Sequence, residues 1–251
     1  MRRNQPTRRR WPALILLSAV ALLGSPPKAL AQDQVKLHVT VAGLKNNQPL
    51  PDRYAFCVPA RTGHVKPGAD ISPAIRWSKG PSATRSYAII MYDPDAPADR
   101  RNMNQEGKTV FFGTPRRTFY HWVLVDLPAA TTALPQGADS RAFTRHGKPP
   151  GPTPHGLRGV NSYTQVFAMT HNTKMMGTYG GYDGPCPPWN DERPHHYHFT
   201  VYALDIPKLQ LAAGFDAAQA LQAMKGHVLA RGEAVGVYSL SPAVRGKLHM
   251  D

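Results

Sequence analysis

The sequence lacks the short motifs that mark common hydrolases and nucleotide-binding enzymes. Its 251 residues contain no G-x-S-x-G, no H-E-x-x-H, no G-x-x-x-x-G-K-[ST] and no G-x-G-x-x-G. These patterns supply, in turn, a serine nucleophile, a zinc site, a phosphate-binding loop and a dinucleotide-binding turn. No other nucleophile stands out. We therefore expect a protein that is not an enzyme, with no catalytic residue and no cofactor.

Acidic residues are also scarce. Asp and Glu number 16 against 30 Lys and Arg, which leaves a formal charge of +14. A basic surface favours an anionic ligand, an acidic protein partner or an anionic membrane surface. Nucleic acid is not an expected partner, because the sequence has no zinc-finger, RNP or basic-helix pattern.

Long apolar runs are absent apart from one near the start. Residues 1–10 carry five arginines and no acid, Trp11–Gly24 is an apolar run of 14 residues, and Ala29-Leu30-Ala31 follows. The order of basic, apolar and A-x-A segments is typical of a secretory signal peptide. The alternative, an uncleaved membrane anchor, would need roughly 18 apolar residues. We expect cleavage near Ala31, a periplasmic or secreted location, and one mature domain over 32–251.

Cysteine is nearly absent, with Cys57 and Cys186 as the whole complement. In an oxidising compartment an even pair favours a disulfide, and two separate buried thiols are the alternative. A bridge would close a loop of more than 100 residues, for which chain entropy gives a stabilisation of about 4–5 kcal/mol as an upper figure.

Alternating and continuous apolar runs predict a mainly β domain. One convincing helix is expected after Asp216, which can cap it, with Gly226 as its stop. No repeat or composition shift divides the chain. The prediction is a single-domain β-sandwich with one or two peripheral C-terminal helices. The strands are expected at residues 35–41, 54–58, 71–77, 86–92, 118–127, 163–169, 195–204 and 234–240.

The stretch Tyr92-Asp93-Pro94-Asp95-Ala96-Pro97 follows the most apolar of these runs. Proline keeps the residue before it extended, and residues two apart in an extended segment point the same way. Asp93 and Asp95 are therefore expected to face one spot, with the strand pairing ending at Pro97. The alternative interpretation of this stretch is a polar turn after a strand.

Histidines form two further groups. His121 lies inside an aromatic and apolar strand, where a buried core histidine is the alternative to a functional one. His195, His196 and His198 invite a metal site, which would need three or four converging ligands. Alternation puts His195 on the face of Tyr197 and the other two on the opposite face. We therefore expect no metal.

These segments, in their order along the chain, resemble the phosphatidylethanolamine-binding protein family, in its bacterial Raf-kinase-inhibitor-like branch. The resemblance rests on the Asp93 stretch, His121-Trp122, the Gly184–Pro188 loop and His195-His196-Tyr197. It implies a β-sandwich of the phosphatidylethanolamine-binding type with a small pocket at one end of the central sheet. It also favours the Cys57–Cys186 disulfide. The implied ligand-binding residues are Asp93, Asp95 as support or rim, His121, Gly184, Pro187, His195 and Tyr197.

The resemblance implies a binding protein for phosphate-type anions or phospholipid head groups. A carboxylate beside histidines can serve such a ligand in two ways. Asp93 can meet the ammonium of a zwitterion, or it can be protonated and donate to phosphate. An inhibitor of an exported protease or kinase is the alternative function, acting through the basic segment 98–118. The third hypothesis is a small hydrolase that uses the Asp and His side chains as acid and base.

Overall fold

Strands dominate the part of the chain that the computed structural model describes, which is Met1 and residues 35–248. The predicted signal peptide and its cleavage point lie outside these residues, Met1 apart. Within residues 35–248 the strands form three sheets. The chain is mainly β, as the alternating apolar pattern predicts.

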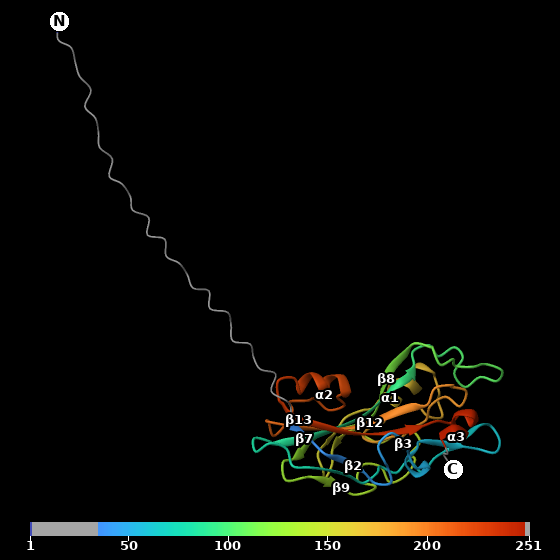
Figure 1. Ribbon diagram of the computed structural model, residues 1–251, viewed down its shortest axis with the longest axis horizontal. Helices are drawn as coiled ribbons and strands as arrows, with labels where there is room; N and C mark the ends of the chain where they lie inside the picture. Colours follow the sequence, from blue (N-terminus) through green and yellow to red (C-terminus); the bar gives the residue numbers. More distant parts are fainter. Residues whose placement is uncertain (2–34, 249–251) are drawn as a thin grey trace. The chain divides into compact units, whose positions relative to one another are not determined.

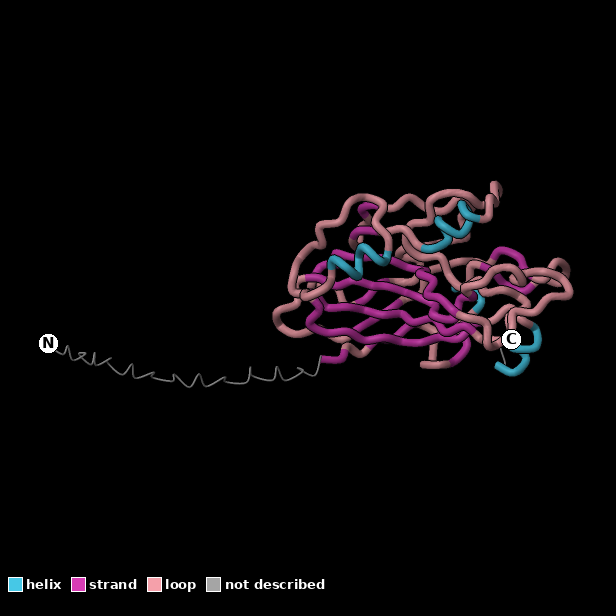
Figure 2. The backbone as a smooth tube through the Cα atoms, turned by 90° about the horizontal axis from the view of Figure 1, so that it is seen from above, coloured by secondary structure: helices cyan, strands magenta, loops and turns pink. Residues whose placement is uncertain are grey.

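The largest sheet has eight strands in the described residues, and its four long central members pair antiparallel (Figures 1 and 2). In spatial order it contains β1 (Val35–Lys36), β13 (Val228–Tyr238), β12 (His195–Leu204), β7 (Ser86–Pro97), β8 (Arg116–Pro128), β11 (Leu157–Arg158) and β10 (Gly151–Pro152), with β3 (Gln48–Pro49) beside β13.

Two smaller sheets accompany it. One contains β2 (Val39–Val41), β6 (Ile75–Trp77) and β9 (Ala133–Leu134), and the other pairs β4 (Cys57–Pro59) with β5 (Val65–Pro67). β6 covers only the last three residues of the strand predicted at 71–77: it begins two residues after Pro73 and is the central strand of its sheet, not an edge strand. The sandwich consists of the largest sheet and the β2-β6-β9 sheet with apolar side chains between them.

The central strand β7 is apolar on both faces because both faces are covered. Ile89 belongs to the cluster that also holds Val41 and Trp77 of the small sheet. Ile90 belongs to a second cluster with Ala220 of α2 (Ala217–Ala223), which lies over the other face (Figure 1). Burying each isoleucine contributes roughly 1.5–3 kcal/mol. The two layers fix β7, and with it the position of the Asp93 stretch.

The described helices are short. They are η1 (Asp52–Tyr54), α1 (Ser162–Met169), α2 and α3 (Pro242–Leu248). Asp216 caps α2, with its carboxylate accepting the N–H of Gln219, and Gly226 has φ +83° beyond its end. That predicted helix is confirmed. No described helix is long and apolar enough to cross a membrane.

Three further predicted strands are wrong in part or in full. Residues 163–169 form helix α1, because Asn161 caps it by accepting the N–H of Tyr163. Residues 35–41 divide into β1 and β2, which belong to different sheets. Residues 54–58 begin in the turn η1, and β4 starts only at Cys57. Helix α1 and the turn η1 replace two of the predicted strand segments, and residues 37–38 interrupt the third.

Candidate functional site

A cavity of about 490 Å³ lies at the end of β7, β8 and β12 where the Asp93 stretch is found. Sites for small organic ligands commonly span about 300–1,000 Å³. Of the residues predicted to bind ligand, five line this cavity and two do not. Those that line it are Asp93, His121, Pro187, His195 and Tyr197.

The two carboxylates of the Asp93 stretch do not face one spot. The register of β7 against β8 shifts between Asp93 and Ala96, so β7 carries one extra residue there. Such a bulge breaks the alternation of side chains. Asp93 and Ala96 line the cavity, while Asp95 bonds His196 Nδ1 at 2.8 Å and Arg193 at 3.2 Å. The predicted convergence is wrong because of this bulge, and β7 does end at Pro97.

A second bulge places His121 at the cavity. Met91 pairs with Trp122 and Tyr92 pairs with Tyr120, which leaves His121 as the extra residue of β8. The His121 ring then contacts Tyr197 with centroids 5.1 Å apart. Without the bulge, alternation would put neighbouring His121 and Trp122 on opposite faces.

His121 is held as a neutral ring. Its Nδ1 lies 2.9 Å from the carbonyl oxygen of Asp183. A carbonyl only accepts, so Nδ1 carries the proton and Nε2 is left as an acceptor. Burial lowers the pKa of His121 to about 4, against the charge of Asp93. At neutral pH this ring therefore offers a lone pair rather than a positive charge.

His195 is held as a cation. Its Nδ1 lies 2.7 Å from Asp93 Oδ2 and its Nε2 lies 3.1 Å from Asp191 Oδ2. Burial opposes the charge, but the Asp93 carboxylate and the bonds to both acids outweigh it and raise the pKa to about 9. Asp191 is also paired with Arg116. Burial tends to raise the pKa of Asp191, but its bonds to His195 and Arg116 lower it.

Tyr197 brings an unsatisfied hydroxyl to the cavity. Its side chain is fully buried, and its Oη has no hydrogen-bond partner among the described residues. Buried polar atoms are nearly always paired, so the orphaned hydroxyl of this cavity-lining residue points to a partner that a ligand or water would supply.

Gly184 stands behind the cavity and not in its lining. A Cβ there would lie 1.8 Å from the carbonyl oxygen of Tyr54, so only glycine fits. Its N–H donates to Asp70 and its carbonyl accepts from the Tyr163 hydroxyl. Gly184 therefore packs the loop against the protein, while its neighbours Cys186, Pro187 and Pro188 line the cavity.

This loop is held by the disulfide Cys57–Cys186, which joins residues 129 apart in the sequence. The predicted bridge is present. By the chain-entropy model a loop of this length gives about 4–5 kcal/mol. The bridge ties one wall of the cavity to β4.

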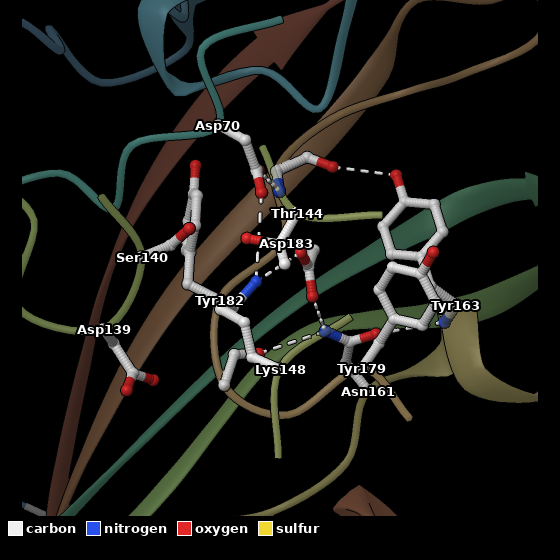
Figure 3. A network of polar contacts seen from close by, with 12 residues as sticks. Asp70, Asp139, Ser140, Thr144, Lys148, Asn161, Tyr163, Tyr179, Tyr182 and Asp183 are labelled. Atoms are coloured by element: carbon white, nitrogen blue, oxygen red, sulfur yellow. Dashed lines mark hydrogen bonds and ion pairs between the residues drawn. The ribbon is translucent and has the colours of Figure 1, made fainter. Parts of the chain in front are cut away.

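A buried polar network supports the same loop (Figure 3). Lys148 Nζ lies 2.5 Å from Asp183 and 3.9 Å from Asp70, and Asn161 donates to Asp183 at 2.7 Å. Burial and the charge of Asp183 raise the pKa of Asp70. The network fixes Asp183, whose carbonyl orients His121.

Sequence reasoning missed several lining residues. Phe119 lies two residues before His121 and lines the cavity, and α1 forms another wall through Tyr163, Val166 and Phe167. Asn161 as a helix cap, with apolar residues at spacings of three and four, was the signal for α1. Arg100 and Arg117 also line the cavity.

The remaining histidines lie elsewhere. His196 bonds Asp95, and His198 stacks on Tyr92 with centroids 4.8 Å apart. Residues 35–248 contain no group of three or more His, Cys, Asp or Glu side chains placed to hold a metal ion. The predicted split of the three histidines between the two faces of β12 is present.

The family model for phosphatidylethanolamine-binding protein matches residues 40–239. UPF0098 protein YbhB of Escherichia coli K12 is 31% identical over 196 residues, covering 78% of this chain and 96% of that protein. UPF0098 protein YbcL of the same organism is 27% identical over 227 residues, covering 90% and 98%. Its crystal structure, described as a member of the mammalian family, aligns with TM-score 0.57 and 26% identity over 82% of this chain and 99% of that one.

The chain therefore belongs to the phosphatidylethanolamine-binding protein family. The resemblance drawn from the sequence motifs is confirmed, and so is the β-sandwich that it implied.

Proposed function

We propose that this protein is an exported, non-enzymatic binding protein whose cavity takes a small phosphate-bearing or zwitterionic ligand of the phospholipid head-group class. The observation that carries the proposal is that Tyr197 lines the cavity while its buried hydroxyl has no partner among the described residues. A phosphate oxygen is a strong acceptor for such a donor. The proposed export rests on the basic and apolar pattern of residues 1–31.

The polar groups around Tyr197 suit binding better than turnover. Asp93 is already hydrogen-bonded to His195 and to the N–H of Asp95. Cys186, which could have offered a thiol, is in a disulfide. The neutral His121 supplies an acceptor for the hydroxyl or ammonium of a ligand. The cavity thus offers fixed donors and acceptors without a free nucleophilic thiol.

Calorimetry with inorganic phosphate and phosphoethanolamine tests this proposal. We expect Tyr197→Phe to weaken phosphate binding roughly tenfold, because a hydrogen bond to a charged group is worth about 1.5–3 kcal/mol. Tyr120→Phe is the matched control, since Tyr120 packs with the cluster on the other face of the sheet. Equal affinities for wild type, Tyr197→Phe and Asp93→Asn would show that phosphate does not bind in this cavity.

A second candidate function is that of an inhibitor of an exported protease or kinase. It is favoured by two neighbouring aromatic side chains, Phe111 and Phe112, which are 62% and 58% exposed on the segment 98–118. Large apolar groups exposed beside arginines are typical of contact surfaces.

Replacing both phenylalanines by serine should then abolish capture of a protease or kinase target while phosphate binding persists. Met176→Ser is the control, because Met176 is also exposed but lies outside this segment. The same basic segment suits peripheral contact with an anionic membrane. Binding to phosphatidylglycerol vesicles that the double variant loses would point to the membrane instead.

A further inference from the structure

Two arginines face the cavity from different elements. Arg117 lies on β8 opposite Ala96, and it shares a face of that strand with Phe119. Arg100 follows the end of β7 and lines the same cavity. Both arginines therefore belong to the lining that also includes Asp93.

Neither arginine has an acidic partner among the described residues. The Nε of Arg117 is buried and makes no hydrogen bond. Burial and the nearby charge of Arg117 lower the pKa of Arg100. The arginines next to them in sequence are different, since Arg101 pairs with Asp99 and Arg116 with Asp191. Two partly buried like charges without a counter-ion are unfavourable, and a bound anion relieves that cost.

The cavity as a whole carries an excess of positive charge. Arg100, Arg117 and the cation His195 face a single carboxylate, Asp93, so two positive charges remain. Asp191 also contacts His195, but its negative charge is matched by the positive charge of Arg116, with which it forms an ion pair. The net charge of the cavity is therefore unchanged. His121 adds no charge at neutral pH, because burial lowers its pKa to about 4.

The segment that follows Arg100 is fixed in place. The side chain of Asn190 accepts the N–H of Asn104 at 2.9 Å and donates to the carbonyls of Asn102 and Lys108 at 2.8 and 3.0 Å. Residues 102–108 are thereby held against the segment that follows Pro188, another cavity residue. This support fixes the backbone next to Arg100, which lowers the cost of ordering that segment when an anion binds.

We propose that Arg100 and Arg117 form an anion-binding subsite that makes the cavity select phosphomonoester dianions over zwitterionic head groups. The inference rests on the proposed function, because the same cavity must bind the ligand. Guanidinium groups suit phosphate through paired N–H donors, and two of them match a doubly charged group. The apolar wall of Phe119, Val166 and Phe167 then receives the organic part of the ester.

Calorimetry with ethyl phosphate and phosphoethanolamine tests the subsite, since the two differ by one ammonium group. We expect ethyl phosphate to bind wild type more tightly. Arg117→Gln and Arg100→Gln should each weaken it roughly tenfold or more, as for the loss of a charge-assisted hydrogen bond. Arg117→Lys, which keeps the charge but not the paired donors, should retain part of the affinity. Arg101→Gln, outside the cavity lining, is the matched control and should bind as wild type does.

The outcomes separate this subsite from the proposed function. Phosphate binding that Tyr197→Phe weakens and both arginine variants leave unchanged would overturn the subsite and keep the function. Tighter binding of phosphoethanolamine than of ethyl phosphate would overturn the selection for dianions. No binding of any probe by folded wild type would overturn both. A urea unfolding curve for each variant identifies losses due to misfolding, and Arg100, which is partly exposed, supplies the second variant.

Discussion

Two histidine rings line one cavity with nearly equal burial and opposite protonation. His121 is 3% exposed and His195 is 1% exposed. Burial disfavours the charge on both, yet the pKa of His121 falls to about 4 and that of His195 rises to about 9. The difference lies in their hydrogen-bond partners. A peptide carbonyl holds His121, and two carboxylates hold His195.

The contrast shows that a cavity can present an acceptor and a cation side by side without any difference in solvent exposure. The positive charge on His195 is also largely neutralised within the protein, because the carboxylates of Asp93 and Asp191 both contact its ring. A ligand anion therefore depends on other donors. Among residues 35–248, the Tyr197 hydroxyl and the two arginines without an acidic partner are such donors.

The largest effect is expected when one carboxylate of His195 is removed. Asp191→Asn leaves Arg116 and His195 with a neutral neighbour, and breaking a buried ion pair costs about 3–5 kcal/mol. Urea unfolding near pH 7 measures the loss. Asp205→Asn is the control, because the Asp205–His227 pair is exposed and should be worth less than about 1 kcal/mol. Equal losses in the two variants would show that His195 is not held by Asp191.

The next effect is a loss of stability in alkali. The folded pKa of His195 is about 9, above its unfolded value of about 6.5. Its contribution is therefore complete below about pH 6.5 and is lost as pH rises through about 9, with a total on the order of 3 kcal/mol. Comparing the unfolding free energies of wild type and His195→Gln across this pH range isolates the contribution of His195 to stability. A difference between them that does not change with pH would contradict the assigned cation.

The smallest effect distinguishes the two carboxylates of the Asp93 stretch. Asp95→Asn should cost roughly 1–3 kcal/mol of stability, because Asp95 bonds His196 and Arg193. Phosphate affinity should stay within about twofold of wild type, since a charge-assisted contact would be worth far more. Asp93→Asn should instead strengthen phosphate binding, because it removes the carboxylate that lines the cavity. Calorimetry measures the phosphate affinity of both variants. A large loss of affinity in Asp95→Asn would show that Asp95 belongs to the binding site.

Much of the fold could be predicted because its strands obey simple alternation. The apolar faces of β12 and the double coverage of β7 follow directly from their residues. The site was harder, because it is built where alternation fails. Bulges at Asp93 to Ala96 and at His121 decide which side chains meet, and nothing in the residues themselves fixes a bulge.

The remaining gaps have other causes. Helix α1 was mistaken for a strand because Asn161 was not recognised as its cap. Arg100 and Arg117 could not be assigned to the cavity, because a basic loop usually faces solvent. Their lack of acidic partners among the described residues is a property of the packed protein, which pairs the neighbouring Arg101 and Arg116 instead.

We expect the disulfide Cys57–Cys186 to give the cavity a redox dependence. Cys186 is both a bridge sulfur and part of the lining, so reduction frees one wall. By thermodynamic reciprocity, the factor by which reduction weakens a ligand is the factor by which that ligand protects the bridge from reduction. Titration of the disulfide with dithiothreitol, with and without ethyl phosphate, measures this coupling. The bridge therefore links occupancy of the cavity to the thiol balance of the compartment in which the protein works.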